Sequence, residues 1–201
     1  MNMSDILSAI DYVGTFVFAV TGATIAGKSD FDFFGMLFLA FLTAVGGGTV
    51  RDLIISETVF WTIDPVYLYI IFFSTLSTFF LMKVYERSAP LLFFLDSLGM
   101  ATFVVIGTHK TLLLNYNVET AFIMGTMSAV LGGILRSAYS REYSILYKKE
   151  LYATVAGIAS ILFIFMRKMD ISMDICVPIV IISSVAIRYA SVKWKVQLPT
   201  I

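Results

Sequence analysis

Seven apolar segments, each about as long as a membrane-spanning helix, constrain this chain more than any other feature of its sequence. A bilayer core about 30 Å thick needs about 20 mostly apolar residues in helical form. Windows of that kind, bounded by charged or turn-forming residues, run over 6–27, 33–55, 66–82, 89–108, 120–139, 151–166 and 175–191. We therefore expect an all-α membrane protein with seven transmembrane helices.

These segments leave little chain for anything else. Seven spans of about 20 residues use roughly 140 of the 201 residues, so we expect a single transmembrane domain over 1–201. The first span contains Asp11 and has no basic segment before it, so we expect it to stay in the mature protein rather than act as a signal peptide.

The composition argues against several classes of soluble protein. Hydrophobic residues make up 59% of the chain and charged residues 14%, and 14 Lys and Arg balance 14 Asp and Glu, so no net charge attracts nucleic acid. Cys176 and His109 are the only residues of their types, which leaves too few ligands for a zinc or iron–sulfur site. With His109 expected in a loop and no catalytic motif, we expect no enzyme and no cofactor.

The basic residues predict an orientation, because Lys and Arg in short connections stay on the cytoplasmic side. One side of the membrane holds three of them, and the other, which includes the C-terminal tail, holds eight. The two sets are Lys110, Arg167 and Lys168, and Lys28, Lys83, Arg87, Arg141, Lys148, Lys149, Lys193 and Lys195. We therefore expect the N-terminus outside and the C-terminus in the cytoplasm of a prokaryotic (inner) membrane. Arg188 is expected to extend to the cytoplasmic interface.

The chain matches itself without gaps at an offset of 85 residues. Asp11, Gly14, Phe18, Val20, Gly22, Ala44, Val45, Gly47, Gly48 and Arg51 meet Asp96, Gly99, Phe103, Val105, Gly107, Ala129, Val130, Gly132, Gly133 and Arg136. Because three spans separate the copies, the second copy enters the membrane from the opposite side. We expect an inverted 3+3 repeat, with units at about 6–84 and 89–167 and a seventh helix at about 175–191. Such repeats are typical of transporters and channels.

Glycines interrupt the apolar pattern of the second and fifth spans. Gly46, Gly47 and Gly48 lie in one, and Gly132 and Gly133 in the other, and each glycine costs about 1 kcal/mol of helix propensity relative to Ala. We expect these glycines to break or bend the helices within the membrane and expose carbonyls to a water-filled path. The alternative is that they allow close helix packing.

Two arginines follow the glycines by three residues. A lipid-exposed charge near the bilayer centre costs at least about 2.5–3.5 kcal/mol, so Arg51 and Arg136 should face the bundle interior. Adjacent residues on a helix point in different directions, so we expect the partner of Arg51 on another helix rather than at Asp52. A role in a pore and purely structural ion pairing both remain open.

Polar residues at matched positions complete the candidate site. Asp11 and Asp96 are carboxylates within apolar spans, where they either line a cavity or complement a helix dipole. Thr43 and Ser128 place hydroxyls just before the glycines, although such hydroxyls usually bond to their own helix.

The stretch from Gly46, G-G-G-T-V-R-D-L-I-I-S-E-T-V-F-W-T-I-D-P-V-Y-L, resembles the signature of the trimeric intracellular cation (TRIC) channels and their prokaryotic relatives, some of which are labelled glycine transporters. G-G-I-L-R from Gly132 and K-E-L-Y-A-T-V-A-G from Lys149 resemble the second repeat of that family. The resemblance implies a homotrimer of seven-helix protomers, each with a cation pore at kinked second and fifth helices. Ser137 stands where many relatives have Asp.

The pore-forming positions implied by the resemblance are Gly46, Gly47, Gly48, Arg51, Asp52, Gly132, Gly133 and Arg136. Two functions follow from the same elements. In a channel, carbonyls and carboxylates form a passive path for K⁺ or Na⁺. In a secondary transporter, they hold a small amino acid such as glycine while the repeats alternate between two states.

Overall fold

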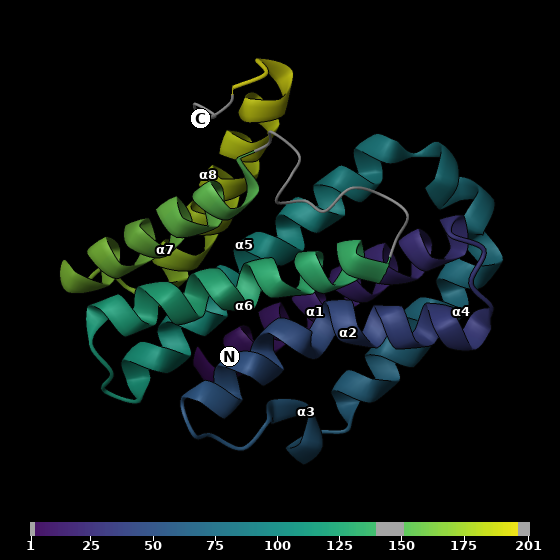
Figure 1. Cartoon of the computed structure of the whole chain (residues 1–201). Coiled ribbons are helices and arrows are strands. Elements are labelled where there is room, and N and C mark those ends of the chain that lie inside the picture. Colours follow the sequence, from purple (N-terminus) through teal and green to yellow (C-terminus); the bar gives the residue numbers. More distant parts are fainter. Residues whose placement is uncertain (1–2, 140–150, 197–201) are drawn as a thin grey trace.

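The chain forms eight helices in the part that the computed structural model describes, which is residues 3–139 and 151–196. They are α1 (Met3–Lys28), α2 (Phe33–Ile54), α3 (Phe60–Ile63), α4 (Val66–Arg87), α5 (Ala89–Leu113), α6 (Val118–Tyr139), α7 (Tyr152–Lys168) and α8 (Met173–Lys193) (Figure 1). The seven long helices occupy the seven apolar segments of the sequence, and the four-residue α3 lies between two of them. The predicted all-α membrane fold is confirmed.

Six of the described helices are long and apolar enough to cross a membrane. They are α1, α2, α4, α5, α6 and α8. The remaining long helix, α7, has 17 residues, which is at the lower limit of length for a membrane span.

Local sequence signals account for several helix ends. Asp32 precedes α2, and its side chain accepts a hydrogen bond of 2.7 Å from the backbone N–H of Gly35, which satisfies one of the free amides at the helix start. Pro90 lies in the first turn of α5, where its missing N–H costs no helical hydrogen bond. Lys28 and Lys110 lie in the last turns of α1 and α5, where positive charge complements the helix dipole.

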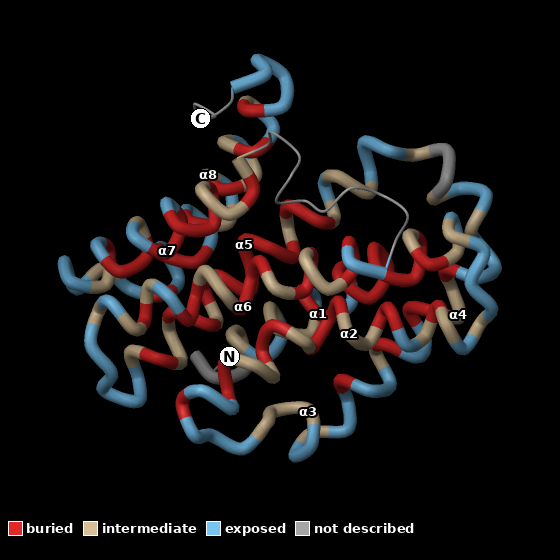
Figure 2. The backbone as a smooth tube through the Cα atoms, in the orientation of Figure 1, coloured by how far each residue is buried: buried red, intermediate tan, exposed pale blue. Residues whose placement is uncertain are grey.

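Helices α1, α2, α5 and α6 pack against one another at the centre of the molecule. Helix α4 lies against α1 and α2 on one side of this group, while α7 and α8 lie against α5 and α6 on the other (Figure 1). Buried residues are concentrated where the four central helices meet (Figure 2). The outer faces carry exposed large apolar side chains, such as Phe73 and Phe80 of α4, as expected for surfaces that contact lipid.

Helices α2 and α6 cross in close backbone contact. A Cβ on Gly47 would overlap the backbone carbonyl of Ser128, and a Cβ on Gly132 would overlap the carbonyl of Thr43. These two contacts are related by the offset of 85 residues, since Gly47 corresponds to Gly132 and Thr43 to Ser128. Such reciprocal contacts are what a two-fold relation between α2 and α6 produces.

The expected interruption of these helices is wrong. Helical structure continues from Phe33 to Ile54 in α2 and from Val118 to Tyr139 in α6, through all five glycines. The missing side chains at Gly47 and Gly132 instead allow two backbones to touch, which is the packing alternative. Close contact stabilises the continuous helices and outweighs the low helix propensity of glycine.

Candidate functional site

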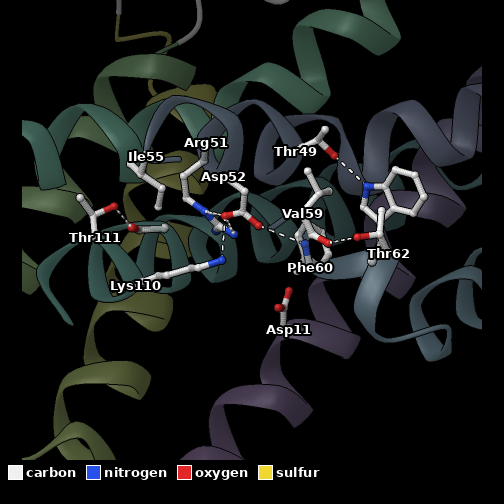
Figure 3. Close-up of polar contacts among 12 residues, drawn as sticks. Asp11, Thr49, Arg51, Asp52, Ile55, Val59, Phe60, Thr62, Lys110 and Thr111 are labelled. Atoms are coloured by element: carbon white, nitrogen blue, oxygen red, sulfur yellow. Dashed lines mark hydrogen bonds and ion pairs between the residues drawn. The ribbon is translucent and has the colours of Figure 1, made fainter. Parts of the chain in front are cut away.

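A first charge cluster, formed by Arg51, Asp52 and Lys110, joins the C-terminal end of α2 to the end of α5 (Figure 3). Asp52 Oδ1 lies 2.7 Å from Arg51 Nη2 and 2.9 Å from Lys110 Nζ. Asp52 is fully buried and Arg51 is 3% exposed. A buried charge is tolerated when it is paired, and one carboxylate here serves two cations.

This arrangement corrects the expected partner of Arg51. The guanidinium bonds to Asp52 of its own helix, through Nε at 2.8 Å as well as Nη2. The Arg side chain is long enough to fold back along the helix surface, so a neighbour that points in another direction can still be reached. The second cation on this carboxylate does come from another helix, at Lys110.

The short helix α3 covers the first charge cluster. The backbone N–H of Phe60 donates to Asp52 Oδ2 at 3.2 Å, and Trp61 Nε1 donates to the Thr49 hydroxyl at 2.9 Å (Figure 3). The Phe60 ring lies 5.9 Å from the Arg51 guanidinium, and it occupies the space that a side chain at Gly48 would need. The segment between α2 and α4 is therefore fastened over this end of the central helices.

A second charge cluster consists of Asp96, Arg136 and Arg188, from α5, α6 and α8. Asp96 Oδ1 lies 2.8 Å from Arg136 Nη2, and Asp96 Oδ2 lies 2.8 Å from Arg188 Nη1. Arg136 also donates to the Thr21 hydroxyl at 2.8 Å. The predicted interior position of Arg136 and its pairing with a carboxylate of another helix are confirmed.

Arg188 is one of the functional candidates that sequence reasoning missed. It was expected at the membrane interface, but it is 5% exposed, with its guanidinium 4.8 Å from the Phe93 ring and 4.6 Å from the Tyr152 ring. Two aromatic faces and a carboxylate replace the water that an interfacial arginine would keep. Because α8 lies outside the repeat, the 85-residue match gave no signal for it.

The two charge clusters lie on opposite sides of the α2–α6 crossing. Four residues forward in α6, from Ser128 to Gly132, correspond to four residues back in α2, from Gly47 to Thr43, so the helices run antiparallel there. Continuing the register places Arg136 level with position 39 of α2, which is roughly 18 Å from Arg51 at about 1.5 Å per residue. A buried segment shorter than a bilayer core separates the clusters.

The two repeats differ in how they hold their arginines. In the first repeat, Asp52 follows Arg51 and forms an ion pair with it. In the second, Ser137 follows Arg136, and the Arg136 guanidinium bonds instead to Asp96 on α5. Asp11, the counterpart of Asp96, is therefore left without an arginine in hydrogen-bond contact among the described residues. It accepts a hydrogen bond of 2.7 Å from the Tyr67 hydroxyl through Oδ2.

Three side-chain oxygens are buried without a hydrogen-bond partner in the described part of the chain. They are Asp11 Oδ1, Thr15 Oγ1 and Ser128 Oγ. Buried polar groups nearly always have a protein or water partner, so each of these oxygens needs an explanation. All three belong to α1 or α6, which are central helices.

The remaining predicted site residues lie at or near the α2–α6 crossing. Thr43 donates back to the carbonyl of Leu39 at 2.7 Å, as hydroxyls inside helices usually do, and Ser128 packs against Gly107. A Cβ on Gly46 would meet the Leu135 side chain, and Gly133 is buried beside Gly132. Apart from Asp11, the predicted positions thus divide between one helix crossing and the two charge clusters.

His109 was expected in a loop, but it lies within α5 with its ring 6.1 Å from that of Phe163. The helix extends beyond the predicted end of the span because residues after Thr108 continue its hydrogen bonding. Among the described residues, no group of three or more His, Cys, Asp or Glu side chains is placed to hold a metal ion.

The fold and these buried ion pairs define a membrane protein of many helices with a charged interior. A family model described as "Glycine transporter" matches residues 8–83 and again residues 93–168, so the second match begins and ends 85 residues after the first. That displacement equals the offset of the repeat in the sequence.

Curated relatives cover nearly the whole chain. A UPF0126 membrane protein of Vibrio cholerae is 36% identical over 98% of this chain and 83% of the relative. The UPF0126 inner membrane protein YadS of Escherichia coli K12 is 34% identical over 95% of this chain and 94% of the relative. The chain therefore belongs to the family that the "Glycine transporter" model describes, together with the UPF0126 membrane proteins. The resemblance to the TRIC family, drawn from the glycine and arginine motifs, is confirmed.

Solved structures share the fold. The structure of the TRIC channel orthologue from Rhodobacter sphaeroides superposes with a TM-score of 0.90 at 29% identity, covering 95% of this chain and 99% of that one. A second structure, described under conductance through TRIC cation channels, gives a TM-score of 0.86 at 27% identity and covers 96% of both chains. A prokaryotic TRIC channel crystallised in 0.5 M KCl matches with a TM-score of 0.87 at 20% identity, which shows a common fold.

Proposed function

We propose that the protein is a passive channel for monovalent cations, K⁺ or Na⁺, with a separate pathway in each protomer. The observation that carries this proposal is a set of three buried oxygens on α1 and α6, at Asp11, Thr15 and Ser128, that have no hydrogen-bond partner in the described part of the chain. Water or a cation passing between the central helices would satisfy these oxygens. The likeness to solved cation channels supports the same function.

The pathway follows the α2–α6 crossing, between the two charge clusters. Each cluster holds its carboxylate between two basic side chains. Arg51 and Arg136 therefore fix the helices at the two ends of the crossing and do not contact the permeating ion. Opening requires the crossing helices to part or bend at their glycines, since Gly47 and Gly132 touch the partner backbone. The kinks implied by the resemblance belong to that open state.

The membrane arrangement is part of the same proposal. All seven long helices cross the membrane, α7 included, as an inverted 3+3 repeat followed by α8. The N-terminus lies outside and the C-terminus in the cytoplasm of the inner membrane, as the distribution of Lys and Arg indicates. Three copies assemble through small and apolar residues on their helix faces, because lipid tails remove the hydrophobic drive and leave packing to hold helices together.

The family description favours a second function, secondary transport of a small amino acid such as glycine. A transporter of that kind typically holds its substrate at broken helices, whose half-helix ends face the carboxylate and amine. In this chain α2 and α6 continue through their glycines. The continuous helices favour the channel.

Flux into proteoliposomes separates the two functions. We expect K⁺ to enter passively down its gradient in the presence of the full-length protein, with unlabelled glycine having no effect. Saturable uptake of labelled glycine, with counterflow when the vesicles are preloaded with unlabelled glycine, would contradict the channel and establish the transporter.

A further inference from the structure

The two repeats carry matched carboxylates in very different states. Asp96 is held by two arginines, each at 2.8 Å, so both of its oxygens are engaged. Asp11 has one oxygen on the Tyr67 hydroxyl, and its other oxygen, Oδ1, is buried with no partner among the described residues. The positions are equivalent in the repeat, yet of these two carboxyl groups only Asp11 keeps a buried oxygen without a partner among the described residues.

A second free oxygen lies one helical turn along the same face of α1. Thr15 is completely buried, and its hydroxyl has no hydrogen-bond partner among the described residues. Thr21 and Thr24, the other threonines of α1, both donate back to backbone carbonyls of their own helix. Residues four apart on a helix have Cβ atoms about 5–6 Å apart, so Asp11 and Thr15 are neighbours on one face of α1.

This face of α1 points into the bundle. Phe18 and Gly22 continue it at the helical spacing, and Phe18 lies against Gly99 of α5 and Gly132 of α6, while Gly22 packs against α2. The Phe18 ring pairs with that of Phe103 at 5.2 Å between centroids. Asp11 and Thr15 therefore lie on the interior face of α1, on the same stripe of the helix as Phe18 and Gly22.

The charges nearest Asp11 belong to the first charge cluster, where Arg51 and Lys110 share the one carboxylate of Asp52 and leave one net positive charge. Figure 3 shows the Asp11 carboxylate beside Phe60, next to this cluster. A cation beside Asp11 would therefore be held by the oxygens that contact it, not by a surplus of negative charge around it. Tyr67 fixes the Asp11 carboxylate through Oδ2, which holds the remaining oxygen in place.

We propose that Asp11 and Thr15 form a binding site for a partly dehydrated monovalent cation, and that this site is present in the first repeat only. Carboxylate and hydroxyl oxygens suit a hard cation, and water completes its shell. The inference rests on the proposed cation pathway and adds to it the residues that bind the ion. Asp96 then has a structural role, because its arginines exclude a cation.

Thallium, which replaces K⁺ and scatters X-rays anomalously, tests this site. Full-length protein is crystallised in a thallium salt, as wild type and as the variants Asp11→Asn, Thr15→Val and Thr24→Val. Thr24→Val is the matched control, because Thr24 is equally buried on the same helix but its hydroxyl is bonded to Val20. We expect an anomalous peak beside Asp11 and Thr15 in wild type and Thr24→Val, a weaker peak in Thr15→Val and none in Asp11→Asn.

Thallium flux into proteoliposomes provides the second readout. We expect about a tenfold loss in Asp11→Asn, about threefold in Thr15→Val and less than about twofold in Thr24→Val. A wild-type map without the peak, with Thr15→Val conducting as well as Thr24→Val, would overturn the site while wild-type flux still supports the channel. A peak at Asp11 in protein that conducts nothing would support the site and overturn the channel.

Discussion

Gly47→Ala should destabilise the protein although alanine is the better helix former. The substitution gains about 1 kcal/mol of helix propensity. The added Cβ overlaps the backbone carbonyl of Ser128, and a backbone cannot rotate away as a side chain can, so the steric cost lies near the upper end of the overpacking range, about 3 kcal/mol. The net loss is about 2 kcal/mol of unfolding free energy, measured by unfolding in mixed detergent micelles with circular dichroism.

Gly157→Ala is the matched control. Gly157 is a buried helical glycine, but a Cβ there would meet only the Phe122 ring, at an ordinary contact distance of 3.5 Å. Gly157→Ala should raise the unfolding free energy by up to about 1 kcal/mol. Gly132→Ala is the repeat counterpart of Gly47→Ala and should lower the unfolding free energy by about as much as Gly47→Ala does. If Gly47→Ala were as stable as Gly157→Ala, close packing at the crossing would not explain why Gly47 and Gly132 occupy matched positions in the two repeats.

Three further predictions concern the charge clusters and the assembly. Asp96→Asn removes the negative charge shared by Arg136 and Arg188 and should lower the unfolding free energy by about 3–5 kcal/mol in the same assay. A loss below about 1 kcal/mol would refute a structural role for the second charge cluster. Lys110→Met should cost less than Asp96→Asn, because the Lys110 side chain is 28% exposed and Arg51 still pairs with Asp52; an equal or larger loss would contradict this ranking. In a covalently linked trimer with one wild-type protomer and two carrying Gly47→Leu, about a third of the current should remain, whereas complete loss would indicate a shared central pore.

Apolar length alone predicted the positions of the seven long helices, because a bilayer core sets how many apolar residues a span requires. The repeat offset then placed Asp96 and Arg136 at matched positions with Asp11 and Arg51, and the predicted interior position of Arg136 is confirmed by its ion pair with Asp96. These features depend on periodicity and on the cost of burying a charge, and both are visible in a single sequence.

Other features depend on three-dimensional packing and could not be obtained in this way. Propensity predicted interrupted helices at the glycines, but the contact between α2 and α6 stabilises them as continuous helices. Arg188 was placed at the interface because its position near a helix end allowed it, and only the fold brings it to Asp96. The four-residue α3 is too short to show a helical period, so no sequence pattern indicated that Phe60 of α3 would bond to Asp52.

Single-channel recording of the purified full-length protein in a planar bilayer tests the central claim most directly. With KCl on both sides and no glycine, we expect discrete, passive current steps that reverse at the K⁺ equilibrium potential when a K⁺ gradient is imposed with an impermeant anion. A silent bilayer, from protein that takes up glycine when it is reconstituted in liposomes, would contradict the account and establish a transporter.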